Sequence, residues 1–249
     1  MAVILKSKEE REKMRQAGHI VAEILAEMRL AIRPGITTAE LDKIAVAGLE
    51  QHGARSGTFK YRGYPASVCT SVNDEIVHGI PGKRVLQEGD IVSLDFVASY
   101  NGWYADSTIT VPVGTVSPQV QRLLKVTQDA LYRGIAAARA GNRLQDISRA
   151  VQQHVEAAGF SVVRMYAGHG VGRSMHEDPQ VFNYIEPGQQ NLVLKPGMVL
   201  AIEPMVNMGK KETKVLPDKW TVVTADGSYA AHFEHTVAIT TGDADILTL

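Results

Sequence analysis

The strongest constraint on the fold is the stretch Ile91–Val111, IVSLDFVASYNGWYADSTITV, which reads as two strands joined by a tight turn. The turn is Asn101-Gly102, and this pair favours a two-residue type I′ turn because both central positions need a positive φ angle. Such a turn pairs Tyr100 with Trp103 and thereby fixes the register of the whole hairpin.

This register gives the hairpin one apolar face and one face that carries two carboxylates. Asp95 lies opposite Thr108 and Asp106 lies opposite Val97, so both acids share a face. They are diagonal neighbours, roughly 7–8 Å apart at the backbone. Two ionised carboxylates at this range repel, so we expect either a proton on one of them or a cation between them. The alternative is a pair of exposed acids, which the apolar neighbours on the other face argue against; these are Val92, Leu94, Phe96, Ile109 and Val111.

The length allows residues 1–249 to form one domain or two tightly joined halves, and the composition favours a cytoplasmic protein. The chain has 249 residues and a net charge of −1, which argues against DNA binding, since nucleic-acid binders usually carry a basic excess. Its single cysteine, Cys69, excludes an intramolecular disulfide and fits a reducing compartment. The sequence shows no secretory signal and no apolar run long enough to span a membrane.

Helical patterns occur twice, about 106 residues apart. The first helix is predicted to start after Ser7, with Glu10 completing a capping box, and to end near Leu30. A second helix is capped by Thr37 or Thr38 and ends at Gly53. Residues 31–53 align with residues 137–159, which favours two αα-then-β halves, about 1–115 and 116–249, around a pseudo-two-fold axis. The alternative is that any two amphipathic helices with glycine ends would align in this way.

Short apolar runs in the second half predict further strands, so the fold class is α+β. Val162–Tyr166 and Met198–Val206 are each predicted to form one strand, and the second of these contains Glu203. Trp220–Thr224 and Tyr229–Thr240 are predicted to form a final hairpin.

Three polar residues stand in unusually apolar or glycine-rich surroundings. Glu203 and Glu234 lie in apolar strands, where an unpaired carboxylate is costly. His169 lies between two glycines, which allow close approach of the backbone. Together with Asp95 and Asp106 they form an oxygen-rich set with one nitrogen, which suits hard or borderline divalent ions. Because two divalent ions would cancel four carboxylate charges, we consider a two-metal site, although sequence alone does not show that these residues converge.

Six ordered motifs carry a resemblance to a known family over essentially the full chain. On these segments the chain resembles the type I methionine aminopeptidases of the bacterial kind. The resemblance implies the pita-bread fold, with a central curved antiparallel sheet covered by helices. The motifs are SVNDEIVHGIP (71–81), DIVSLD (90–95), Asp106, GHGVGRSMHEDP (168–179), GMVLAIEP (197–204) and FEHTV (233–237).

The resemblance implies a dinuclear aminopeptidase that removes the initiator methionine from nascent proteins with a small second residue. Asp95 would bind one metal ion, His169 and Glu203 the other, and Asp106 and Glu234 would bridge the pair. A hydroxide between the ions would attack the scissile carbonyl. The metal would be Mn, Fe, Co or Zn.

Other matching positions are implied to act on the substrate. His78 and His176 would face it, with His176 supporting the developing oxyanion. Glu203, or a carboxylate beside it, would shuttle the proton. The methionine slot would be formed by Tyr61, Tyr64, Cys69, Met175 and Trp220. Thr58 and Met175 depart from the residues usual in bacterial relatives, which changes the expected shape of the slot. Ordinary loop packing is the alternative for the two tyrosines.

Three other functions remain to be weighed. A pita-bread peptidase that cleaves next to proline usually has an extra N-terminal domain, for which we see no room before Ser7. A non-catalytic binding protein of this fold would be expected to lose metal ligands. A two-metal phosphoesterase would be expected to have a phosphate-binding loop. We expect a monomer with nascent chains as partners; Lys210, Lys211 and Lys214 are predicted to be solvated, with transient docking to the ribosome as the alternative.

Overall fold

Four α-helices and a short 3₁₀ turn lie within residues 3–249, the part of the chain that this computed structural model describes. The first two helices begin as predicted: Ser7 and Thr37 are the N-caps, and Glu10 and Glu40 complete the capping boxes. Gly53 closes the second helix in the left-handed conformation. The helices are α1 (Lys8–Ala31), α2 (Thr38–His52), α3 (Pro118–Ala137) and α4 (Leu144–Ala157), and the 3₁₀ turn is η1 (Tyr61–Gly63).

The main sheet has nine strands, and every pairing in it is antiparallel. Its path runs β1-β4-β5-β14-β9-β7-β8, with β2 beside β4 and β15 beside β14. Two three-stranded sheets, β13-β10-β6 and β11-β12-β3, extend from it. The strands are β1 (Arg55–Ser56), β2 (Cys69–Val72), β3 (Glu75–Val77), β4 (Ile91–Tyr100), β5 (Trp103–Pro112), β6 (Ser161–Val162), β7 (Gly168–Gly170), β8 (Glu177–Val181), β9 (Val199–Ile202), β10 (Met205–Asn207), β11 (Thr213–Val215), β12 (Val222–Thr224), β13 (Ala230–His232), β14 (Glu234–Ala238) and β15 (Asp245–Ile246).

The hairpin of β4 and β5 has the predicted register. Tyr100 pairs with Trp103 across the turn, Asp95 pairs with Thr108, and Val97 pairs with Asp106. Asn101 and Gly102 both have positive φ angles, as a type I′ turn requires. The predicted apolar face is buried against α1 and α2, with Ile109 only partly covered.

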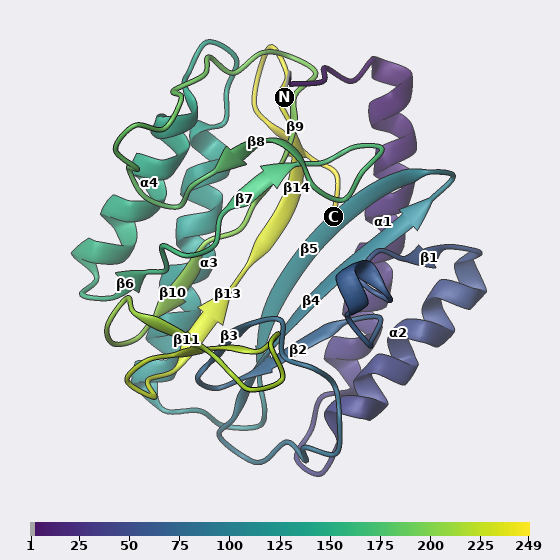
Figure 1. The fold of residues 1–249 in the computed structure, drawn as a ribbon, viewed down its shortest axis with the longest axis vertical. Helices are drawn as coiled ribbons and strands as arrows, with labels where there is room; N and C mark the ends of the chain where they lie inside the picture. The colour runs from purple at the N-terminus through teal and green to yellow at the C-terminus, as the bar shows by residue number, and fades with distance from the viewer. Residues whose placement is uncertain (1–2) are drawn as a thin grey trace.

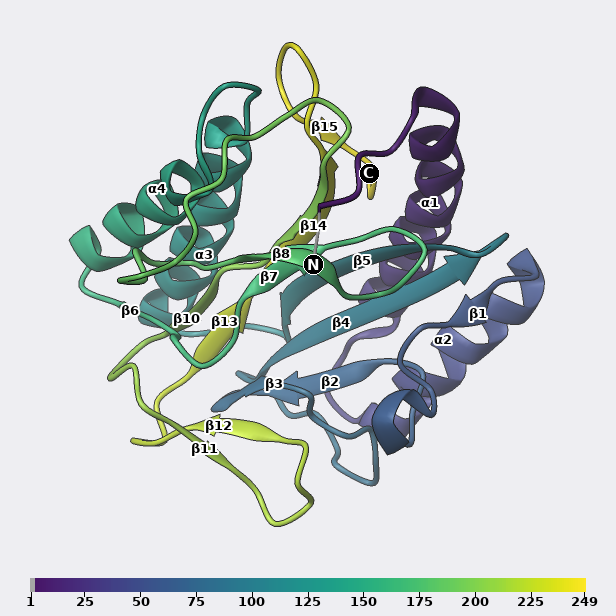
Figure 2. The ribbon, with the colours of Figure 1, turned by 45° about the horizontal axis from the view of Figure 1, so that its top comes forward.

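Helices cover the sheet in two separate groups (Figures 1 and 2). The pair α1 and α2 packs on β4 and its neighbours, and this cluster includes Ile24, Leu41 and Phe96. The pair α3 and α4 packs on β9, β13 and β14, with Ile147 and Leu200 in its core. Strand β14 lies between β5 and β9 and so joins the two parts of the sheet.

Three strand predictions need correction. The run Met198–Val206 is two strands, β9 and β10, which belong to different sheets. The chain bends between them at Glu203-Pro204, where proline offers no N–H to a ladder. Opposite this bend Phe233 separates β13 from β14, and its N–H donates to the carbonyl of Pro204 at 3.4 Å.

The predicted final hairpin is therefore wrong, because β12 pairs with β11 and β3 while β13 pairs with β10. The strand predicted over 162–166 is also shorter, since β6 ends at Val162. Among residues 3–249 we find no helix with the length and apolarity to span a membrane.

Candidate active site

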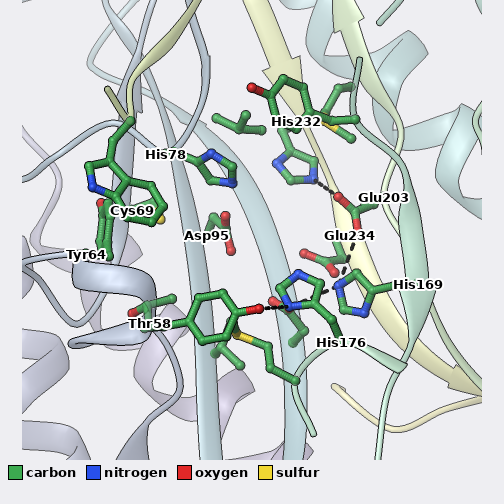
Figure 3. A pocket seen from close by; sticks show the side chains of 18 of the residues that line it. Thr58, Tyr64, Cys69, His78, Asp95, His169, His176, Glu203, His232 and Glu234 are labelled. Carbon is green, nitrogen blue, oxygen red and sulfur yellow. Dashed lines mark hydrogen bonds and ion pairs between the residues drawn. The ribbon is translucent and has the colours of Figure 1, made fainter. Parts of the chain in front are cut away.

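Five separate segments bring their acids and one histidine to a single cavity of about 340 Å³ (Figure 3). The hairpin supplies two of these residues from adjacent strands, and β7, the bend after β9, and the start of β14 supply the others. The sheet order explains the convergence, because β4, β5, β14, β9 and β7 are successive neighbours. The residues are Asp95, Asp106, His169, Glu203 and Glu234.

A compact grouping of possible metal ligands within this cavity is formed by Asp106, His169 and Glu234. One ligand atom from each lies within 4.8 Å of the other two. The Nε2 atom of His169 is 3.8 Å from Oδ2 of Asp106 and 3.6 Å from Oε1 of Glu203. Asp95 and Glu203 stand outside this grouping but line the same cavity.

Burial and mutual repulsion make it hard to ionise all of these acids together. Burial is the main cause that raises the pKa of Asp106, Glu203 and Glu234 well above the usual range, and neighbouring carboxylates raise it further. Burial also raises the pKa of Asp95 to about 6. The repulsion expected from the sequence is therefore present, and a cation between the acids would relieve it.

His169 is held in the tautomer that a metal ligand needs. Its Nδ1 lies 2.9 Å from the carbonyl oxygen of Gly170, which only accepts, so Nδ1 carries the proton and Nε2 keeps its lone pair. Burial lowers the pKa of His169 to about 3 and keeps the ring neutral. The flanking glycines are required by packing, because a Cβ on Gly168 or Gly170 would lie 2.3 Å from a backbone oxygen of a neighbouring segment.

The donor set fits divalent metal ions. Oδ1 of Asp106 and Oε1 of Glu234 are buried without a hydrogen-bond partner, although buried polar atoms are normally satisfied. Each is a hard oxygen donor, and the neutral Nε2 of His169 adjoins them. A metal centre would supply the partner that these atoms lack.

The other side of the cavity is aromatic and apolar. Tyr61, Tyr64, Cys69, Met175 and Trp220 all line it, together with Thr58. Tyr64 and Trp220 meet edge to face with ring centroids 5.1 Å apart. Burial raises the pKa of the Cys69 thiol well above its usual range, so this residue is suited to a wall rather than to a nucleophile.

His78 and His176 also line the cavity. The Nδ1 atom of His176 lies 3.2 Å from the hydroxyl oxygen of Tyr61, and the two rings stack at 5.5 Å. Burial lowers the pKa of His176, and Arg62 lowers it further. Burial lowers the pKa of His78 to about 4, so both rings are expected to be neutral at pH 7.

His232 is a cavity residue to which the sequence assigned no role. Both ring nitrogens are buried and have no hydrogen-bond partner within residues 3–249. The Nε2 atom lies 3.9 Å from Oε2 of Glu203. Burial lowers its pKa to about 3. The available signal was its position two residues before Glu234, which places both side chains on the same side of an extended chain.

The site and fold define a metallopeptidase of one family. Residues 12–241 match the sequence profile of metallopeptidase family M24, and the chain belongs to this family. It is 52% identical to methionine aminopeptidase 1 of Bacillus subtilis, with 99% of each chain covered. It is 45% identical to the methionine aminopeptidase of Escherichia coli, covering 100% of this chain and 95% of that one.

Solved structures agree with this assignment. Methionine aminopeptidase of Rickettsia prowazekii matches at a TM-score of 0.97, with 39% identity and full coverage of both chains. The Thermotoga maritima enzyme matches at 0.96, with 45% identity and 99% of each chain covered. Prolidase of Pyrococcus furiosus shares the fold at a TM-score of 0.81 and 24% identity, and the match covers 99% of this chain but 65% of that one. The predicted pita-bread fold and family are thus confirmed.

Proposed function

We propose that this protein is a methionine aminopeptidase that removes the N-terminal methionine from nascent chains whose second residue is small. One observation carries this proposal: the acid and histidine cluster shares one cavity with a wall of aromatic and sulfur-bearing side chains. Such a cavity would hold a thioether side chain on its apolar wall, with the adjacent peptide bond near the cluster. Relatives with nearly complete coverage carry the same name.

We propose that Asp95, Asp106, His169, Glu203 and Glu234 hold two divalent metal ions. When bound, the ions would supply Lewis-acid polarisation of the scissile carbonyl and lower the pKa of a nucleophilic water. The charge of the site supports two ions. Four ionised carboxylates carry −4, so one divalent ion would cancel half of this charge and two would cancel all of it. We propose Mn, Fe, Co or Zn, all of which accept this mixture of oxygen and nitrogen donors.

The remaining steps belong to side chains of this protein. In the tautomer of His176 whose Nδ1 accepts from the Tyr61 hydroxyl, Nε2 carries the proton and can donate it to the carbonyl oxygen of the substrate. Glu203, beside His169, can carry a proton from the nucleophile to the leaving amine. His78, which meets Trp220 and Tyr166 edge to face, would orient the substrate.

The pocket would recognise methionine by shape. Tyr64 is 3% exposed and Met175 is 6% exposed, so both are buried in the wall of the cavity. Met175 is unbranched and adaptable, which would make this slot more permissive than one with a rigid ring at that position. The hydroxyl of Thr58 donates a hydrogen bond to the carbonyl of Ala66 at 3.2 Å, so its proton is not directed at the substrate.

We also propose that residues 1–249 form one catalytic domain with pseudo-symmetric halves that meet near residue 115. It would act as a monomer in the cytoplasm, where its substrates, the N-termini of nascent chains, emerge. Lys210, Lys211 and Lys214 are exposed, and transient docking to the ribosome would use such a loop.

The test is cleavage of Met-Ala-Ser by the purified protein, compared with an Ala-Pro peptide, with bound metal counted. Chelator should abolish cleavage of Met-Ala-Ser, and Mn²⁺, Co²⁺ or Fe²⁺ should restore it. Glu234→Gln should lose metal and activity, whereas Glu27→Gln, at an exposed position on α1, should keep both. Cleavage that is indifferent to chelator, or preferred cleavage of the Ala-Pro peptide, would refute the proposal.

A further inference from the structure

A buried ion pair lies outside the cavity and ties the start of the chain to the segment that carries His176. Lys6 precedes α1, and its side chain is only 2% exposed. Its Nζ lies 2.6 Å from Oε2 of Glu177 and 3.0 Å from the carbonyl oxygen of Ile4. The backbone N–H of Lys6 donates to the carbonyl of Gly197 at 2.7 Å, which fixes this segment on the body of the protein.

The second oxygen of Glu177 closes a turn. Oε1 accepts the N–H of Arg173 at 2.8 Å and that of Ser174 at 3.3 Å. The turn between these amides and Glu177 contains Met175 and His176, both of which line the cavity. Glu177 therefore connects a charge outside the cavity to the loop that holds two cavity residues.

Gly172 packs closely against both members of the pair. A Cβ on Gly172 would lie 2.4 Å from Oε1 of Glu177 and 2.6 Å from Cε of Lys6. The side chain of Glu177 is 9% exposed. A carboxylate with so little access to water needs its counter-charge, because removal of one partner of a buried pair leaves an uncompensated charge.

We propose that Lys6 is a positioning residue for catalysis, which acts through Glu177 on the placement of His176. Without the ammonium, the carboxylate would be expected to turn toward water and release the two amides, and the turn would open. Small misplacements of a catalytic group carry large rate penalties. This inference rests on the proposed function, in which His176 donates to the substrate carbonyl.

The experiment is a mutant cycle with cleavage of Met-Ala-Ser, measured as kcat and KM separately at saturating metal. His176→Ala should lower kcat by about 10²–10³-fold, the usual loss for one oxyanion donor. Lys6→Met should lower kcat by about 10- to 100-fold, with a smaller rise in KM because Met175 lies in the same turn. In the His176→Ala background, Lys6→Met should cause no further loss of kcat, because the imidazole that Lys6 is proposed to position is absent.

Two further variants keep the test decisive if Lys6→Met is unstable. Glu177→Gln combined with Lys6→Met should recover most of kcat, because an amide oxygen still accepts both N–H groups and leaves no buried charge. Arg15→Met, which removes another cation that links the N-terminal helix to a distant segment through Asp245, should leave kcat unchanged.

The outcomes separate this inference from the proposed function. If Lys6→Met costs the same factor with and without His176, or if Arg15→Met costs as much as Lys6→Met, Lys6 is not a positioning residue. If His176→Ala retains the parent kcat, the role assigned to His176 fails instead.

Discussion

Removal of metal should make the stability of this protein depend on pH in a direction set by the buried acids. Burial and mutual repulsion raise the pKa of Asp106, Glu203 and Glu234 well above the usual range in the metal-free chain. An acid whose pKa is higher in the folded than in the unfolded state keeps its proton on folding. The folded state then binds more protons, so the free energy of unfolding falls as the pH rises above the unfolded pKa.

The magnitude follows from the proton count. Each retained proton costs about 1.4 kcal/mol per pH unit. The useful window is pH 7–8, because Asp95, with a pKa of about 6, is already mostly ionised there. The buried His78 and His169, with pKa values of about 4 and 3, are neutral in the folded protein in this window. The Cys69 thiol begins to contribute only near its unfolded pKa of about 8.5.

The assay is urea unfolding at pH 7.0, 7.5 and 8.0 in chelator, with linear extrapolation to water. Glu234→Gln is the comparison, because it deletes one acid and keeps the shape, so the contributions of histidine and cysteine cancel in the difference. The parent should lose more stability than Glu234→Gln between pH 7 and pH 8, by at most about 1.4 kcal/mol, the limit for one proton retained over that interval. Glu27→Gln, with an exposed carboxyl, should follow the parent.

This reasoning would be refuted if the free energies of unfolding of the parent and of Glu234→Gln changed in parallel with pH. It would also be refuted if the parent became more stable relative to Glu234→Gln as the pH rises. Either result would mean that the buried acids hold no extra proton in the metal-free fold. The case for metal ions as the partners of these acids would then lose its electrostatic basis.

Three other outcomes are expected. Gly18→Ala should lower the free energy of unfolding by roughly 1–3 kcal/mol in urea titrations, because its Cβ would lie 1.9 Å from the carbonyl oxygen of Leu247; unchanged stability would contradict this packing. His232→Leu should weaken metal binding in calorimetry by roughly 10- to 100-fold, the usual cost of losing a group that contacts a ligand such as Glu203, and His232→Gln should cost less. Met175→Phe should raise the kcat/KM preference for methionyl over leucyl peptides by roughly 3- to 10-fold, and an unchanged ratio would show that this side chain does not shape the slot.

The parts of the fold that depend on local rules were predictable from sequence. The register of the hairpin follows from one turn, and this register alone puts Asp95 and Asp106 on a common face. The glycines beside His169 indicated close backbone contact, and neighbouring segments do crowd both of them. The family resemblance implied that the five ligand candidates meet at one site. Composition and periodicity alone did not show whether they meet.

The missed features depend on contacts between distant segments. The division of Met198–Val206 between two sheets was hidden by a continuous apolar run, and Pro204 was the signal that the strand should bend. Glu203 lies at that bend. The pair of Lys6 and Glu177 spans 171 residues, and neither position shows a pattern that identifies its partner.

The central position of β14 has a consequence for biosynthesis. Within the main sheet of residues 3–249, β14 (residues 234–238) is the strand that pairs with both β5 and β9 and so links the β4–β5 part to the β9–β7–β8 part. Until that strand leaves the ribosome, β5 and β9 each present an open edge, and such edges invite pairing with other chains. Glu234 arrives with the same strand, so a translation product that stops short of it would lack both the link between the two parts and one of the five proposed ligands.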